Sequence, residues 1–226
     1  HVGGLNTFFY SVFNRGTSII PNSRSVDEII SLCDFYNVEL LPTTPTFLRM
    51  LLFSDFMPKK IPKNIKIISY GTEIMDPETL TRLCKLLPNV DFRQTYGISE
   101  LGVLSTRSER RTSLYFKIGG AGVFTRVRDN VLQIKTSTPM VGYLNAPSPF
   151  TDDGWYDTKD LVATKGDYIK IVGRRNELIN VSGLKFMASD VERILMRYKD
   201  IIFVKVYAKN NPITGQHCEA MVQTAD

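Results

Sequence analysis

The stretch Ile65-Lys66-Ile67-Ile68-Ser69-Tyr70-Gly71-Thr72-Glu73 has the pattern of a short buried strand that runs into a glycine-containing loop. A strong helix start follows, because Asp76 can cap a helix and Pro77 would occupy its first position. Upstream, residues 38–41 predict another strand and residues 46–53 a helix. Strand and helix therefore alternate with short connections, which indicates a layered α/β sheet with helices on its faces.

The front of the chain extends this alternation. Residues 5–13 are apolar and aromatic, which predicts a buried helix, and residues 16–20 predict a short strand. Ser25 is followed three residues later by Glu28, as in a capping box, and an apolar run comes next. We therefore expect a further helix to begin at Ser25.

The pattern changes in the middle of the chain. Residues 115–118, 123–127 and 131–137 alternate in a β-like way, and Asp129-Asn130 suits a hairpin turn between the last two segments. These segments predict a small antiparallel meander. Residues 167–172 predict one more strand.

The rear of the chain reads as a separate small unit. A charged, glycine-flanked break covers residues 173–177, and a helix is expected after it, capped by Ser189 with Glu192 three residues on. Residues 202–207 predict a strand. We expect a domain boundary near Arg175.

Composition narrows the possible functions. The 226 residues are 43% hydrophobic and 23% charged, the balance of a soluble globular protein without a membrane span. The net charge of +5 suits a polyphosphate ligand but is spread without a basic block, which argues against nucleic-acid binding. Cys33, Cys84 and Cys218 match no zinc spacing, so we expect reduced thiols in a cytoplasmic protein.

Two stretches carry side chains suited to ligand chemistry. Gln94-Thr95-Tyr96-Gly97-Ile98-Ser99-Glu100 follows a strand-like run, and open α/β sheets bind ligands at the carboxyl ends of their strands. Its alternative is an ordinary loop with a packed Tyr and a solvated Glu. Gly154-Trp155-Tyr156-Asp157-Thr158-Lys159-Asp160 ends in a carboxylate that could accept hydrogen bonds from both ribose hydroxyls. Its alternative is a surface turn with a capping Asp.

Taken together, these motifs resemble those of the adenylate-forming (AMP-binding) superfamily: acyl- and aryl-CoA synthetases, peptide-synthetase adenylation domains and luciferases. Residues 96–100 resemble Tyr-Gly-x-Thr-Glu, with Ser99 in the Thr place. Residues 154–160 resemble Gly-Trp-Phe-x-Thr-Gly-Asp, with Lys159 in place of the usual Gly. The resemblance covers essentially the whole chain.

Three shorter segments support the resemblance. Tyr70-Gly71-Thr72-Glu73 is similar to the family's adenine-side loop, and His1-Val2-Gly3-Gly4 to its His-x-Gly-Gly segment. Residues 173–192 resemble its hinge and the glycine-rich loop that follows, with Asn176 where Asp or Lys is usual. The resemblance implies that residues 1–175 are the rear of the large sheet-and-helix domain with a small antiparallel β subdomain. Residues 176–226 would begin a small, mobile α+β domain.

The resemblance also implies roles for single residues. Tyr96 and Gly97 would lie against the adenine, with Gly71, Thr72 and Glu73 on its other side. Ser99 would bond the α-phosphate and Glu100 would hold Mg²⁺. Asp160 would clamp the ribose hydroxyls, and Arg174 would contact ribose or phosphate. Asn176 would be the hinge, while His1 and Gly183 would line the channels for the acid and the pantetheine thiol.

The activity implied is an ATP-dependent, AMP-forming ligation of a small-molecule carboxylic acid to a thiol. The thiol would belong to coenzyme A or to the phosphopantetheine of an acyl carrier protein. A non-catalytic nucleotide- or acyl-binding remnant and a peptide-synthetase adenylation domain are the alternatives. The family's phosphate loop and its C-terminal catalytic Lys are absent from these 226 residues. We therefore expect a fragment that is inactive alone.

Overall fold

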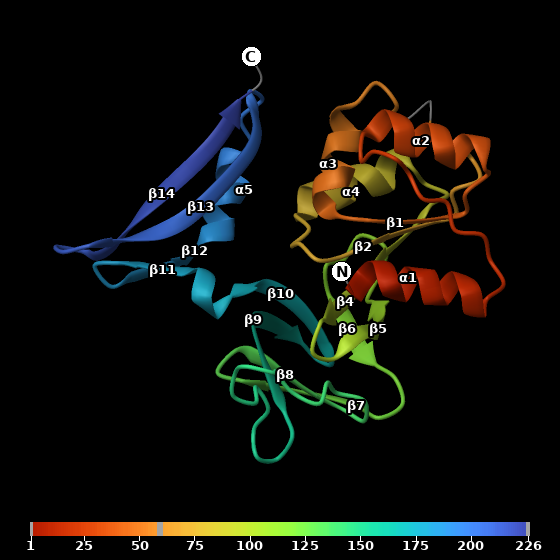
Figure 1. The fold of residues 1–226 in the computed structure, drawn as a ribbon. Helices are drawn as coiled ribbons and strands as arrows, with labels where there is room; N and C mark the ends of the chain where they lie inside the picture. The colour runs from red at the N-terminus through yellow and green to blue at the C-terminus, as the bar shows by residue number, and fades with distance from the viewer. Residues whose placement is uncertain (1, 58–60, 225–226) are drawn as a thin grey trace. The chain divides into compact units, whose positions relative to one another are not determined.

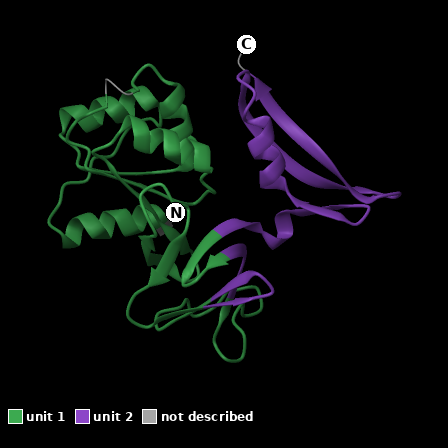
Figure 2. Cartoon of the chain, turned by 180° about the vertical axis from the view of Figure 1, so that it is seen from behind, with its two compact units in different colours: residues 1–125, 134–156, 164–170 green, residues 126–133, 157–163, 171–226 purple. Residues whose placement is uncertain are grey.

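The computed structural model describes residues 2–57 and 61–224. The chain divides into two compact units, coloured separately in Figure 2. Unit 1 comprises residues 1–125, 134–156 and 164–170, and unit 2 comprises residues 126–133, 157–163 and 171–226. The boundary expected near Arg175 stays a prediction. Among the described residues, no helix is both long and apolar enough to cross a membrane.

Unit 1 contains a three-stranded parallel sheet. Its strands are β1 (Leu40–Thr43), β2 (Ile67–Tyr70) and β3 (Asp91–Gln94), in the order β1-β2-β3. The register sets Tyr70 opposite both Thr43 and Gln94, so the three strands end level with one another. The alternation read from the sequence is thus confirmed, with β1 shifted two residues beyond the predicted 38–41. Pro42 lies within β1, where it is tolerated because β1 is an edge strand.

Three helices accompany this sheet (Figure 1): α2 (Val26–Phe35), α3 (Pro45–Phe53) and α4 (Pro77–Leu86). Their buried side chains form one core with the sheet, including Ile30, Leu48, Leu51, Ile68, Leu80 and Leu83. Cys33 and Cys84 are buried in this core, and burial raises the pKa of both thiols. Cys218 is only partly buried.

Side chains cap these helices where the sequence predicts. The Asp76 carboxylate accepts a hydrogen bond from the Thr79 N–H at 2.7 Å, and Ser25 Oγ accepts one from the Glu28 N–H at 3.2 Å. The capping box is incomplete, because the Glu28 carboxylate accepts from the N–H groups of Asn22 and Ser23. Both predicted helix starts are confirmed.

The first helix, α1 (Val2–Phe13), forms as predicted but is not buried. Large apolar side chains on it are half exposed or more: Leu5, Phe8, Phe9, Tyr10, Val12 and Phe13. A helix that is apolar all round is buried only when other elements surround it. The strand predicted for residues 16–20 is wrong. Arg15 has φ +53° and the Gly16 N–H bonds the Ser11 carbonyl, so these residues close α1 instead.

A seven-stranded sheet follows, in the order β4-β5-β6-β10-β9-β8-β7. The strand pairs β4–β5, β5–β6 and β6–β10 are antiparallel. Its strands are β4 (Tyr96–Ile98), β5 (Gly102–Ser108), β6 (Phe116–Gly119), β7 (Val123–Arg128), β8 (Val131–Thr136), β9 (Tyr156–Lys165) and β10 (Tyr168–Arg174). Asp129 and Asn130 both have positive φ, so the predicted hairpin turn is confirmed. The division into units runs through β7, β8, β9 and β10.

The rear of unit 2 is a small α+β body. A 3₁₀ turn, η1 (Arg175–Glu177), leads to β11 (Leu178–Val181), β12 (Leu184–Met187), α5 (Ala188–Leu195), β13 (Ile201–Asn211) and β14 (Gly215–Thr224). The sheet order is β12-β11-β14-β13. Its core contains Ile179, Ala188, Val204 and Val206.

The helix cap predicted at Ser189 is wrong. Helix α5 begins at Ala188, and the residue before it, Met187, makes no side-chain cap bond. Ser189 Oγ donates instead to the Val172 carbonyl at 3.5 Å, and the Glu192 carboxylate accepts from the Val206 N–H at 2.9 Å. Glu192 therefore connects α5 to β13 through this hydrogen bond.

Candidate functional site

The loops that follow β2 and β3 lie side by side at the carboxyl edge of the parallel sheet. The Thr95 N–H and Oγ1 both donate to the Tyr70 carbonyl, at 2.7 and 3.1 Å. A Cβ on Gly71 would lie 2.3 Å from Thr95 Oγ1 and 2.8 Å from the Thr95 carbonyl oxygen. Only glycine fits here, because the backbone that it meets is itself held by hydrogen bonds. The structure thus brings together the two segments predicted to flank the adenine.

The second glycine of this edge, Gly97, is required by strand pairing. It lies in β4 opposite β5, and a Cβ there would be 2.8 Å from both the Gly102 carbonyl oxygen and Val103 Cα. The neighbouring Tyr96 is half-buried, and its ring centroid lies 6.1 Å from that of Phe116. Tyr96 therefore has a fixed aromatic neighbour on one side.

Glu73 is tied to the start of α3. Its carboxylate accepts from the Thr46 N–H at 3.0 Å and from Thr46 Oγ1 at 2.6 Å, and Arg49 lies 3.5 Å away. A carboxylate at a helix N-terminus satisfies an orphan N–H and suits the helix dipole. Thr72, which precedes it, is exposed and has φ +70°. Glu73 thus orients the loop that carries Gly71.

Glu100 is contacted by two residues of one loop that is far from it in the chain. Its backbone carbonyl accepts from the Met140 N–H at 2.8 Å, and its carboxylate accepts from the Tyr143 hydroxyl at 2.5 Å. This hydrogen bond raises the pKa of Tyr143. Burial, followed by the charge of Glu100, raises the pKa of Tyr156. Sequence reasoning missed both tyrosines, although Tyr156 lies within the stretch quoted for Asp160. Ser99, one residue before Glu100, is exposed.

In unit 2, Asp160 and Arg174 lie together. Arg174 Nε donates to Asp160 Oδ1 at 3.0 Å, and the Asp160 side chain is almost fully buried. The Asp160 N–H bonds Thr158 Oγ1, which donates to the Leu132 carbonyl. The segment is therefore part of a strand with a buried carboxylate, and the surface turn weighed as its alternative is wrong.

Lys159, the departure from the family motif, has φ +62°. A side chain in this left-handed region costs about 1–2 kcal/mol, which explains why glycine suits the position. Two contacts with Asp157 offset part of this strain. The Lys159 N–H bonds Asp157 Oδ1 at 3.0 Å, and Nζ lies 3.3 Å from Oδ2.

The remaining predicted residues lie in exposed turns of unit 2 or outside the described ranges. Asn176 is the middle residue of the 3₁₀ turn η1. Gly183 has φ +91° in the turn between β11 and β12, and its N–H bonds Asn180 Oδ1 at 3.0 Å. His1 lies outside the described residues.

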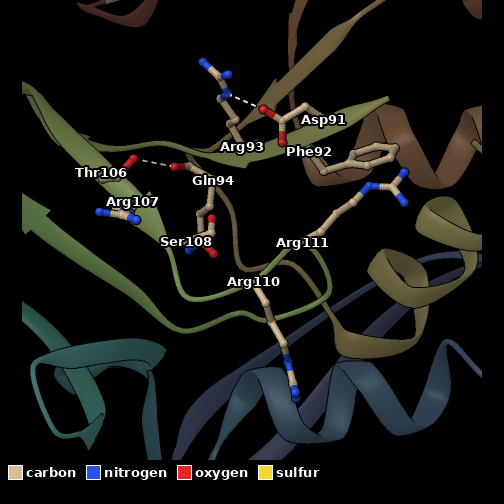
Figure 3. Close-up of a pocket in the computed structure, with 9 residues that line it drawn as sticks. All are labelled: Asp91, Phe92, Arg93, Gln94, Thr106, Arg107, Ser108, Arg110 and Arg111. Atoms are coloured by element: carbon tan, nitrogen blue, oxygen red, sulfur yellow. Dashed lines mark hydrogen bonds and ion pairs between the residues drawn. The ribbon is translucent and has the colours of Figure 1, made fainter. Parts of the chain in front are cut away.

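A pocket of about 330 Å³ lies beside β3 (Figure 3), and none of the predicted site residues lines it. Its lining consists of Asp91, Phe92, Arg93, Gln94, Thr106, Arg107, Ser108, Arg110 and Arg111. Figure 3 shows the arginine side chains pointing apart. Arg93 Nε bonds Asp91 at 2.7 Å. The pocket is therefore lined by basic side chains, but these side chains do not point toward a common position.

Arg111 of this pocket has a structural role. Its guanidinium donates to the carbonyls of Val90 at 2.9 Å and Cys84 at 3.1 Å, and to that of Leu87. It also lies over the Phe92 ring, 5.6 Å from the centroid. These carbonyls lie in and beyond the last turn of α4, so Arg111 caps that helix end.

The sheet edge can contribute to a metal site but does not form one alone. Among the described residues, no group of three or more His, Cys, Asp or Glu side chains is placed to hold a metal ion. Mg²⁺ is commonly bound by one or two carboxylates together with phosphate oxygens of a substrate. The oxygen chemistry of Glu100 fits such a shared site.

Comparison with known proteins gives a family and a fold. The model of the family "AMP-binding enzyme" matches residues 1–134. A 4-coumarate--CoA ligase-like protein of Arabidopsis thaliana is 25% identical over 96% of this chain. The mitochondrial acyl-coenzyme A synthetase ACSM2A of Homo sapiens is 25% identical over 87% of it. The chain spans 42% and 38% of their respective lengths.

Solved structures show the same fold. ATP-bound MatB from Rhodopseudomonas palustris covers the whole chain with a TM-score of 0.82 at 22% identity. An o-succinylbenzoate CoA synthetase of Bacillus subtilis, in complex with its acyl-adenylate intermediate, does so with a TM-score of 0.79 at 18% identity. The chain covers 48% and 49% of those chains. The mixed α/β architecture predicted from the sequence is thereby confirmed.

Proposed function

Because the chain belongs to the family of AMP-binding enzymes, we propose that the protein uses ATP to activate a carboxylic acid as an acyl-adenylate and then transfers the acyl group to a thiol. The observation that carries this proposal is the meeting of residues 70–73 with residues 94–100 at the carboxyl edge of the sheet. Edges of this kind are where α/β sheets bind ligands.

The chemistry of each predicted residue suits its proposed contact with the nucleotide. Tyr96 would stack on the adenine, and the Gly71 backbone can approach its other face because no side chain intervenes. Thr72 and Glu73 would complete that wall. Asp160 fits the ribose, since an ionised carboxylate only accepts hydrogen bonds and the ribose hydroxyls donate them. Arg174 already bonds Asp160 and would hold that carboxylate ready or contact a phosphate.

The phosphates would meet the segment after Gly97. Ser99 is exposed at the start of the turn and would bond the α-phosphate. Glu100 would share Mg²⁺ with phosphate oxygens, and the ion would neutralise charge as pyrophosphate leaves. Catalysis would rest mainly on positioning and on electrostatic stabilisation, since the step concentrates negative charge.

The second step needs access for a thiol, from coenzyme A or from a carrier-protein phosphopantetheine. Apart from its chain neighbours, no described residue comes within 4 Å of the point where Gly183 would carry a Cβ, which leaves room for a slender thiol arm. Asn176 lies in a short 3₁₀ turn with little apolar content, which suits a hinge between residues 1–175 and the small mobile domain of residues 176–226. A location in the cytoplasm accords with three free cysteines.

Calorimetry with AMP tests the nucleotide site. We expect the 226-residue chain to bind AMP and Asp160→Ala to weaken that binding at least ten-fold, because a charge-assisted hydrogen bond is worth about 1.5–3 kcal/mol. Asp167→Ala is the matched control, since it removes an exposed carboxylate paired with Lys117. Equal affinity for AMP in the wild type and in Asp160→Ala would show that Asp160 does not contact the nucleotide.

An exchange assay addresses catalysis. The chain alone should give no ATP–pyrophosphate exchange, because removing even one preorganised contact typically costs about 10²–10³ in rate and the phosphate loop and catalytic Lys are both absent from this sequence. Robust exchange would show that the catalytic groups are assigned wrongly. AMP binding without exchange by a full-length protein would favour a non-catalytic nucleotide-binding remnant.

A further inference from the structure

Glu100 is the anchor of the segment between β8 and β9. This segment, residues 137–150, has no helix and no ladder strand, and Val141 and Leu144 in it are fully exposed. Two hydrogen bonds connect this segment to Glu100. The Met140 N–H donates to the Glu100 carbonyl at 2.8 Å, and three residues later the Tyr143 hydroxyl donates to the carboxylate at 2.5 Å.

A second phenol, that of Tyr156, lies near the same carboxylate. Burial, and after it the charge of Glu100, raises the pKa of this phenol. Tyr156 is the first residue of β9, and its ring packs edge-on against Phe150 with centroids 5.6 Å apart. The Glu100 carboxylate thus accepts a hydrogen bond from a tyrosine of the loop and lies near a tyrosine at the start of β9, and both tyrosines belong to unit 1.

A carboxylate that accepts a hydrogen bond from a phenol can still bind a cation. Its two oxygens offer about four lone-pair positions, so a hydrogen bond and a metal ion can share them. A phenol that donates a hydrogen bond stays neutral and leaves the charge of the carboxylate in place. Carboxylates that ligate metals are themselves commonly held by such outer hydrogen bonds, whose loss typically costs about 10–100-fold in metal affinity.

We propose that Tyr143 is a positioning residue for Glu100, and that its hydroxyl fixes the carboxylate in the orientation that binds the divalent cation of a metal–nucleotide complex. The inference rests on the proposed function, because it takes Glu100 to be a metal ligand. It adds a residue outside the recognised motifs, 43 positions from Glu100 in the chain. A purely structural tie would hold the loop but leave metal binding unchanged.

The test separates metal binding from nucleotide binding. The affinity of the chain for Mn²⁺·ATP and its affinity for ATP in EDTA are measured by calorimetry, and their ratio gives the contribution of the metal. In Tyr143→Phe, we expect this ratio to fall about ten-fold while the affinity for ATP in EDTA stays unchanged. Tyr207→Phe is the matched control, because its hydroxyl also donates to a carboxylate, that of Glu219 at 3.0 Å.

Glu100→Gln distinguishes the inference from the function on which it rests. If Glu100→Gln lowers the ratio and Tyr143→Phe does not, Tyr143 has no positioning role and the proposed metal ligand stands. If Glu100→Gln leaves the ratio unchanged, or if no nucleotide binds, the proposed function fails and this inference fails with it. An equal fall in Tyr207→Phe would also overturn it.

Discussion

Strand β3 borders two different regions of unit 1, and they differ in what a ligand would find there. At its carboxyl end, Gly71 and Thr95 lie so close that a single Cβ would collide with the backbone. Along its length, a pocket of about 330 Å³ is lined by four arginines. The pocket offers an open volume lined by charged side chains, whereas at the strand end the backbones of two loops approach closely and few side chains are charged.

The difference shows that a hollow with cations is not by itself a binding site. In the pocket, Arg111 is used to cap α4 and Arg93 is paired with Asp91. At the strand end, glycine is required twice and a half-buried Tyr96 is held against Phe116. Such preorganisation is typical of sites that hold a flat, charged ligand.

Gly71→Ala should give the largest effect. Its Cβ would lie 2.8 Å from the Thr95 carbonyl oxygen, and overpacking of this kind costs about 1–3 kcal/mol. We expect the free energy of unfolding, measured in urea, to fall by about 3 kcal/mol, the upper end of that range. Gly119→Ala is the control, because among the described residues only its chain neighbours would lie within 4 Å of the added Cβ. Equal losses in the two variants would contradict the close approach.

Arg111→Met should lower the free energy of unfolding by about 2 kcal/mol. Hydrogen bonds from a charged donor contribute about 1.5–3 kcal/mol each, but the released carbonyls at the end of α4 can turn to water. Urea denaturation measures the loss. Arg93→Met, which removes only an exposed ion pair, should change stability by less than about 1 kcal/mol. If Arg111→Met is also neutral, the arginine is available to a ligand.

Tyr96→Ala should weaken AMP binding about ten-fold, because stacking a base on an aromatic ring contributes about 1–3 kcal/mol. Tyr96→Phe keeps the ring and should keep the affinity. Calorimetry compares the two variants after thermal unfolding has shown that both are folded. A loss of affinity in Tyr96→Phe as large as that in Tyr96→Ala would mean that the hydroxyl group, and not the ring, matters.

Arg107→Gln should have the smallest effect. Arg107 is an exposed arginine of the pocket, and exposed charges act weakly beyond about 8 Å at physiological salt. We expect the affinity for AMP to change by less than about two-fold at that salt concentration. A larger loss would place the phosphate in the pocket.

The elements that the sequence predicts well are those with local signals. The start of α4 follows from Asp76-Pro77, and the β7–β8 hairpin follows from Asp129-Asn130, because these residue types favour one backbone conformation. Local signals also mislead. Ser189 and Glu192 have capping-box spacing, but tertiary contacts with β10 and β13 engage their side chains instead.

Local signals also predict only part of the site. The motif alone indicates that Gly71 matters, and the close approach of Thr95 explains why a glycine is needed there. The tie between Glu100 and Tyr143 joins residues 43 positions apart, and no periodicity links them. The prediction that α1 is buried was wrong. An apolar sequence favours burial, but it does not show whether other elements of the described chain pack against the helix.

Chemical-shift mapping with AMP tests the central claim most directly, namely that the nucleotide binds at the carboxyl edge of the sheet. The chain is labelled with ¹⁵N and titrated with AMP, and the shifted amides are assigned. We expect the largest shifts at residues 71–73 and 96–100, with smaller ones at Asp160. Largest shifts at Arg107, Ser108 and Arg110, with none at Gly71 or Tyr96, would place the ligand in the arginine pocket and contradict the account.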